Sequence, residues 1–110
     1  MSGYTSESKR YIIGGLLNES KHQDGKIRVQ DGTPAWLGYD YQYHAAQWTL
    51  VKSLANEFKS LEEAVKTALG GHAGPWYYKI KPETIKILEV STVKTVTERF
   101  VDRSEFEVYI

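Results

Sequence analysis

Aromatic residues recur between Trp36 and Trp48, and they are the side chains of this chain best suited to binding chemistry. Tyr39, Tyr41 and Tyr43 stand at every second residue, a spacing that places their rings on one face of a strand. Such a row of phenols could wall a ligand site or a partner surface. It could equally be the inward face of a sheet, because aromatic side chains dominate core burial.

Asp40, Tyr41 and His44 are the neighbouring groups with acid–base potential. A histidine titrates near neutral pH, and a carboxylate can orient its ring. The alternative is a half-exposed histidine at a strand end. The three histidines of the chain are far apart, and none has a zinc-binding spacing such as His-Glu-x-x-His. We therefore predict no catalytic residue, no metal site and no cofactor.

The composition is that of one folded domain. The chain has 110 residues, of which 41% are hydrophobic and 25% charged, close to the average for globular domains. Fourteen basic residues balance fourteen acidic ones, which argues against binding to nucleic acid through bulk positive charge. There is no cysteine, so stability must come from packing. We expect a single domain over residues 1–110, with a flexible tail at 1–9.

Targeting signals are not evident in the sequence. No window approaches the roughly 18 apolar residues that span a membrane. Residues 1–10 are polar and lack the apolar run of a signal peptide. These features predict a cytoplasmic protein with no membrane partner.

Turn signals divide the first part of the chain into strands. Residues 11–17 are apolar and are interrupted by Gly14 and Gly15, which predicts a bulge or the close approach of another backbone. Residues 26–30 alternate in polarity, and we expect them to form a hairpin with residues 11–17. Asp31-Gly32 then predicts a turn into a third strand.

The third strand has two distinct faces. The face predicted to point toward the core carries Ala35, Leu37, Tyr39, Tyr41 and Tyr43. The opposite face carries Trp36, Gly38, Asp40, Gln42 and His44. Alternation of this kind is expected for a strand buried on one side.

A helix is the clearest local prediction. Ser60 and Glu63 form a capping box, and Gly70-Gly71 supplies a left-handed stop. The apolar residues between them fall at helical spacing. Residues 48–58 also fit a helical face, which predicts a second helix upstream.

The last third of the chain is predicted to be mostly strand. Residues 76–80 read as one strand, and the β-branched run at 85–101 reads as one long strand with a bulge near Leu88. Phe106, Val108 and Ile110 alternate with charges and predict a final strand or a contact with a second copy. Together the patterns predict an α+β fold, an antiparallel sheet of about five strands with one or two helices packed on one face.

One group of residues resembles a known kind of protein. It comprises Trp48, Thr49, Ala55, Phe58, Ser60, Glu62, Glu63 and Ala64. This pattern resembles small phage and bacterial α+β accessory proteins over about a quarter of the chain. The resemblance implies an accessory protein of the phage type, a kind of which some members inhibit host or defence machinery, and it transfers no functional residues.

We therefore predict a non-enzymatic binding module that presents aromatic residues to a protein or a small molecule. The candidate binding residues are Trp36, Tyr39, Tyr41, His44, Trp76 and Tyr77. A homo-oligomer through the C-terminal strand is also expected, because β-branched residues gather there.

Nucleic acid is the alternative partner. Bases would stack on aromatic side chains, and lysines beside them would contact phosphates. The residues concerned are Trp36, Trp76, Tyr77, Tyr78, Lys79, Lys81 and Lys86. An enzyme built on Asp40 and His44 is the third and least favoured hypothesis.

Overall fold

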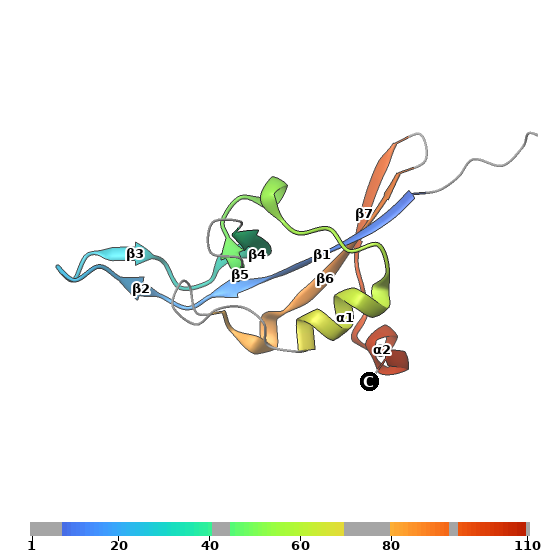
Figure 1. The fold of residues 1–110 in the computed structure, drawn as a ribbon. Coiled ribbons are helices and arrows are strands. Elements are labelled where there is room, and N and C mark those ends of the chain that lie inside the picture. Colours follow the sequence, from blue (N-terminus) through green and yellow to red (C-terminus); the bar gives the residue numbers. More distant parts are fainter. Residues whose placement is uncertain (1–7, 41–44, 70–79, 93–94, 110) are drawn as a thin grey trace, which may run out of the picture.

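The computed structural model describes residues 8–40, 45–69, 80–92 and 95–109 of the protein. Its centre is a five-stranded antiparallel sheet with the order β5-β4-β1-β6-β7 (Figure 1). The strands are β1 (Ser8–Leu17), β4 (Thr33–Asp40), β5 (Ala45–Thr49), β6 (Lys86–Thr92) and β7 (Val96–Phe100). The predicted α+β class and the antiparallel sheet of about five strands are confirmed.

Helices cover one face of this sheet, which we call the inner face. They are α1 (Leu61–Leu69), α2 (Arg103–Phe106) and the 3-10 helix η3 (Glu107–Tyr109). At the start of α1 the Glu63 backbone N–H donates to the Ser60 hydroxyl at 3.2 Å, the cap that the sequence predicts. Ala64, Val65 and Ala68 form the buried side of α1.

The hydrophobic core lies between the inner face and these helices. Its strand residues include Tyr11, Ile13, Leu17, Ala35, Leu37, Trp48 and Ile87. Phe106 of α2 is among the most deeply buried side chains and fixes the C-terminal segment to the sheet. Burial of Ala35 and Leu37 confirms which face of β4 points to the core.

The opposite, outer face of the sheet is crossed by residues 52–58, which include the 3-10 helix η1 (Lys52–Leu54). Strands β1 and β4 pair only from Gly14 to Leu17 along β1. Beyond that point, Phe58 exchanges backbone hydrogen bonds with Tyr11, and Asn56 N–H donates to the Leu37 carbonyl at 2.8 Å. The segment thereby joins two strands that have separated.

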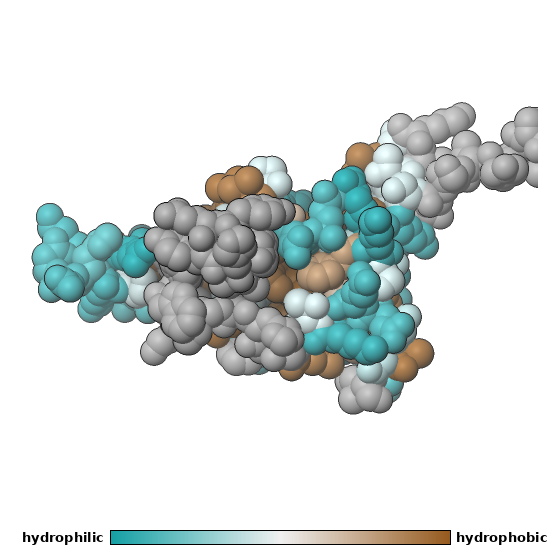
Figure 2. All heavy atoms as spheres, in the orientation of Figure 1, coloured by the Kyte–Doolittle hydropathy of each residue, from teal (hydrophilic) through white to brown (hydrophobic). Residues whose placement is uncertain are grey.

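A second, two-stranded sheet projects from the body of the molecule (Figure 1). It consists of β2 (Ser20–Lys21) and β3 (Ile27–Val29), and its surface is mostly hydrophilic (Figure 2). Val29 at its base is buried, whereas residues 21–28 are exposed. An isolated ribbon of this length is marginally stable, so its attachment to the body through Val29 is important.

Four sequence predictions about the first half of the chain are wrong. Strand β1 pairs with β4 and β6 in continuous register, so residues 11–17 have no bulge and form no hairpin with 26–30. Ser8 and Lys9 begin β1 and are not part of a tail, while residues 1–7 lie outside the described residues. Residues 48–58 contain the end of β5 and η1, not a second long helix. Their apolar residues face no common core, since Trp48 is buried but Val51 and Leu54 are exposed.

The C-terminal region also differs from the prediction. The β-branched run forms the hairpin β6–β7, because the chain turns back after Thr92. The last residues form α2 and η3 in place of a strand. Asp102 caps α2 in a complete capping box with Glu105, a signal present in the sequence as Asp-x-x-Glu. Of the predicted strand at 76–80, only Ile80 is described, and it bridges Leu17.

Candidate functional site

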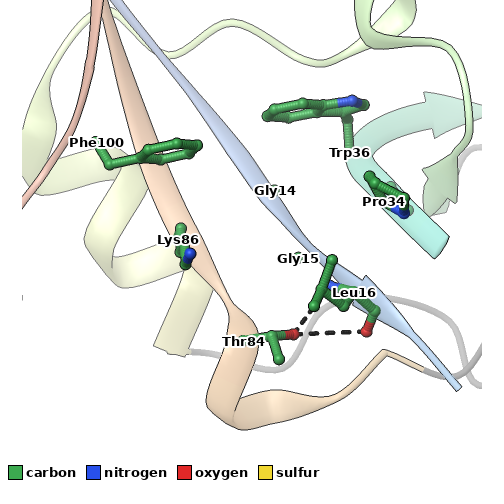
Figure 3. Close-up of a pocket in the computed structure, with 9 residues that line it drawn as sticks. Gly14, Gly15, Leu16, Pro34, Trp36, Thr84, Lys86 and Phe100 are labelled. Atoms are coloured by element: carbon green, nitrogen blue, oxygen red, sulfur yellow. Dashed lines mark hydrogen bonds between the residues drawn. The ribbon is translucent and has the colours of Figure 1, made fainter. Parts of the chain in front are cut away.

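A groove lies on the outer face of the sheet, where β4, β1, β6 and β7 are adjacent. Figure 3 shows the rings of Trp36 and Phe100 reaching over the sheet from opposite sides, with Gly14 between them. The groove encloses about 200 Å³. It is lined by Gly14, Gly15, Leu16, Pro34, Ala35, Trp36, Thr84, Lys86 and Phe100. We call it the Trp36–Phe100 groove.

Gly14 forms the floor because it sits opposite Trp36 of β4 and Lys86 of β6. A Cβ at Gly14 would lie 2.7 Å from Trp36 Cζ3, so the absence of a side chain lets the indole rest on β1. A Cβ at Gly15 would lie 2.8 Å from Cδ1 of Ile80 on the other face. The two glycines therefore serve close packing of side chains on opposite faces, not a bulge.

Each aromatic ring of the groove has a lysine beside it. Lys86 Nζ lies 5.2 Å from the centroid of the Phe100 ring, and Lys52 Nζ lies 5.4 Å from that of Trp36. Both are cation–π contacts. The Phe100 side chain nevertheless remains 55% exposed, and Trp36 is half-buried. Exposed aromatic area with a cation at its edge is typical of recognition surfaces.

Thr84, at the end of the 3-10 helix η2 (Pro82–Thr84), closes one end of the groove. Its hydroxyl accepts the Leu16 backbone N–H at 2.9 Å and donates to the Lys81 carbonyl at 2.6 Å. Figure 3 shows this link between η2 and β1. Because the hydroxyl is already engaged on both sides, it fixes the wall and does not offer a free polar contact.

Lys86 is thus the charged side chain of the groove that can bind a ligand. Within the described part of the chain, its ammonium has no carboxylate partner within salt-bridge distance, in contrast to Lys52, which binds Glu98 at 2.8 Å. The described residues that line the groove include no histidine, aspartate or glutamate and therefore no general acid–base pair. The groove can bind an apolar group that has a negatively charged group next to it.

A polar cluster around the buried Glu89 on the inner face has a structural role. Arg99 Nε and Nη2 donate to the two oxygens of Glu89, each at 3.1 Å, and the same guanidinium binds Glu105 of α2 at 3.0 Å. Burial acts to raise the pKa of Glu89, but hydrogen bonds and charge from Arg99 outweigh it and hold that pKa below its ordinary value. Burial and the neighbouring Glu89 raise the pKa of Tyr11. The cluster fastens α2 to β6 and β7.

The structure brings one predicted binding residue into the groove, Trp36. Tyr39 lies in β4 opposite Ala46. The remaining candidates, Tyr41, His44, Trp76 and Tyr77, lie outside the described residues. The enzyme hypothesis that rests on Asp40 and His44 stays a prediction for the same reason. Among residues 8–40, 45–69, 80–92 and 95–109, no three metal-binding side chains gather at one place.

Sequence reasoning missed Gly14 and Phe100 as groove residues and considered Lys86 only as a phosphate contact. The prediction for Gly14 was a bulge or the close approach of another backbone. A glycine that faces an aromatic residue on the next strand also indicates that the aromatic ring packs against the glycine backbone. Phe100 could be found only from the return of the chain after Thr92, which puts Phe100 opposite Leu88.

No family model, curated protein or solved structure matches this chain. The resemblance to phage and bacterial accessory proteins therefore stays a prediction. In the described residues the longest helix is α1, and no helix is long and apolar enough to cross a membrane.

Proposed function

We propose that the protein is a non-enzymatic binding module, and that the Trp36–Phe100 groove anchors one apolar side chain of a protein partner. An acidic residue next to that side chain would pair with Lys86. The observation that carries the proposal is the combination, in one concave site, of two partly exposed rings, a glycine floor and an ammonium that has no carboxylate partner among the described residues. Aromatic anchors and a charge at the rim are the usual parts of such contacts.

The size of the groove supports a protein side chain over a free small molecule. Its volume of about 200 Å³ is below the roughly 300–1,000 Å³ of pockets that enclose drug-sized ligands. One inserted side chain, flanked by contacts outside the groove, matches the way interface anchors fill small pockets. Gly14 lets the Trp36 indole lie flat against β1, which fixes this ring as one wall of the groove.

Charge supports an acidic partner. Lys86 lies at the groove, and its cation–π contact with Phe100 leaves the ammonium able to donate hydrogen bonds to a carboxylate. Lys52 at the Trp36 ring is neutralised by Glu98, so the groove carries one net positive charge from these two lysines. An apolar residue followed closely by aspartate or glutamate is therefore the expected recognition sequence.

A charge-reversal experiment tests this proposal. A random peptide library is selected on immobilised wild-type protein, and binding of the enriched peptides is then measured on Lys86→Glu. We expect an apolar–acidic consensus whose affinity falls by about tenfold or more on the variant, because an attractive contact becomes repulsive. Peptides with lysine in place of the acidic residue should regain binding to Lys86→Glu.

Two outcomes would contradict the proposal. One is a library that yields no enriched sequence. The other is a consensus whose binding is the same on wild type and Lys86→Glu. Lys66→Glu is the matched control, since Lys66 is exposed on α1, and reversing it should leave peptide affinity unchanged although it breaks the ion pair with Glu62.

The nucleic-acid alternative has less support among the described residues. Lys81 binds Asp31 at 2.9 Å, and Lys86 contacts Phe100, so neither stands in an unbroken basic surface. Trp76, Tyr77, Tyr78 and Lys79 lie outside the described residues. Binding to single-stranded nucleic acid that weakens steeply with salt would favour this alternative.

A further inference from the structure

The outer edge of β7 offers a row of backbone hydrogen-bonding groups. In the described residues β7 is the last strand on its side of the sheet and pairs with β6 alone. The Val101 N–H donates to the Ile87 carbonyl at 2.7 Å, which fixes the phase of the strand. Because backbone groups alternate in direction, those of Thr97 and Arg99 also face β6, and those of Val96, Glu98 and Phe100 face outward.

Exposed edges are normally protected by charge, proline or a bulge. Strand β7 contains no proline, and its pairing with β6 runs without a shift of register. Its two charges are held away from the edge. Glu98 binds Lys52 through both carboxylate oxygens, at 2.8 and 2.9 Å, and Arg99 is held by Glu89 and Glu105. The protection that these charges would give is therefore weakened.

We propose that a second copy of this chain pairs with this edge, with the two β7 strands antiparallel about a two-fold axis at Glu98. Glu98 is the midpoint of Val96–Phe100, so this register pairs the whole strand. Val96 faces Phe100 of the partner subunit, and Thr97 faces Arg99 of the partner subunit. The outward backbone groups then meet in pairs, each of which exchanges two hydrogen bonds.

Apolar exposure favours this register. Val96 is 61% exposed and Phe100 is 55% exposed, and both lie on the outer face of the sheet. Pairing covers each of them with the other, a β-branched residue against an aromatic one, which is a favourable cross-strand combination. The two Glu98 carboxylates face each other across the axis and oppose association, although each keeps its own Lys52. The dimer is therefore weak and depends on protein concentration.

The dimer concerns a different surface from the proposed ligand site, with Phe100 shared between them. Its ring lines the Trp36–Phe100 groove, whereas its backbone groups face the free edge. Val96 of the partner subunit would lie beside Phe100, at the rim of the groove. The two proposals can be tested separately, because Lys86, on whose charge peptide binding depends, does not lie at the β7 edge.

Residue-resolved hydrogen exchange at several protein concentrations, combined with sedimentation velocity, tests this proposal on the unmodified chain. The amides of Thr97, Arg99 and Val101 should be protected at every concentration. Those of Val96, Glu98 and Phe100 should exchange freely in dilute solution and become protected as the dimer forms. A monomer at all concentrations would overturn the proposal, as would a dimer without this change or protection of the outward amides already in the dilute monomer.

Two variants test the register. Val96→Pro removes an outward donor and leaves the inward hydrogen bonds to β6 in place, so the dimer should weaken by about tenfold. Glu98→Gln removes the opposed charges, so the dimer should strengthen by about two- to fivefold. Val108→Ser, an exposed apolar residue away from the edge, should leave association unchanged. Weaker association of Glu98→Gln would show that Glu98 does not lie on the axis.

Discussion

Gly14 and Gly15 are neighbours in β1, yet they face regions of opposite character. Gly15 points to the inner face and touches Ile80, within a core that the helices cover. Gly14 points to the outer face, where Trp36 rests on it and Phe100 stands beside an open groove. The same two-residue motif therefore supports close packing of Ile80 at the border of the core on one side and of Trp36 beside a partly exposed aromatic site on the other.

The two faces separate residues that maintain the fold from residues that are free to bind. Apolar side chains on the inner face are in a closed core, so their loss removes stability. Phe100 on the outer face keeps more than half of its surface exposed, so its loss should remove peptide binding and weaken self-association but cost little folding stability.

Ile87→Ala should have the largest effect on stability. Ile87 is fully buried on the inner face, and truncation leaves a cavity beneath α1. We expect the free energy of unfolding to fall by about 2–5 kcal/mol. Denaturant titration measures this change, and a loss below 1 kcal/mol would show that the inner face is not closely packed.

Gly14→Ala should destabilise more than Gly15→Ala, although both add the same methyl group. At Gly14 the new Cβ meets the rigid indole of Trp36, and at Gly15 it meets the flexible end of Ile80. We expect a loss of about 1–3 kcal/mol for Gly14→Ala and a smaller one for Gly15→Ala. Equal losses, measured by thermal and denaturant unfolding, would contradict the account of the groove floor.

Acid should destabilise the inner face through Glu89. The pKa of Glu89 is lower in the folded protein than in the unfolded chain, where it is about 4.3. On acidification the unfolded chain therefore binds more protons than the folded protein. The free energy of unfolding should fall as the pH drops below about 4.3 and through the folded-state pKa. Glu105, whose pKa the Arg99 hydrogen bonds also lower, contributes with the same sign. Glu89→Gln should cost about 1–2 kcal/mol at neutral pH and flatten this acid dependence. An unchanged slope in unfolding titrations would exclude Glu89 as its source.

Phe100→Ser should have the smallest effect on folding. The ring is largely exposed, so we expect a change in unfolding free energy of less than about 1 kcal/mol. Peptides selected on the wild type should nevertheless lose most of their affinity, because one wall of the groove is gone. Val108→Ser, at a more exposed apolar residue, should change neither quantity. A large loss of stability in Phe100→Ser would place this ring with the core.

Local signals were the part of the fold that the sequence could predict. Helix α1 depends on the Ser60 cap and on apolar spacing within a few residues, and both are evident in the sequence. The inward face of β4 follows from alternation. The capping box at Asp102 is equally local, but the prediction for this segment rests on the alternation of Phe106 and Val108 and does not use the box.

Non-local pairing was the part that the sequence could not predict. Strand β1 lies between β4 and β6, and nothing within residues 11–17 indicates either neighbour. The groove depends on that pairing, since Trp36, Gly14 and Lys86 meet only across three strands. Trp36 could be predicted because its place in β4 follows from alternation. Phe100 could not, because its place in the groove depends on the pairing of β7 with β6.

We claim that the outer face at Gly14 is a binding surface, and an NMR titration can check this claim residue by residue. A peptide selected on the wild type is added to isotope-labelled protein. We predict that the largest shifts appear at the Gly14 amide, the Trp36 indole N–H and the Phe100 amide, and that Ile13 and Ile87 on the inner face move little. Shifts centred on the inner face, or on the β2–β3 ribbon, would contradict the claim.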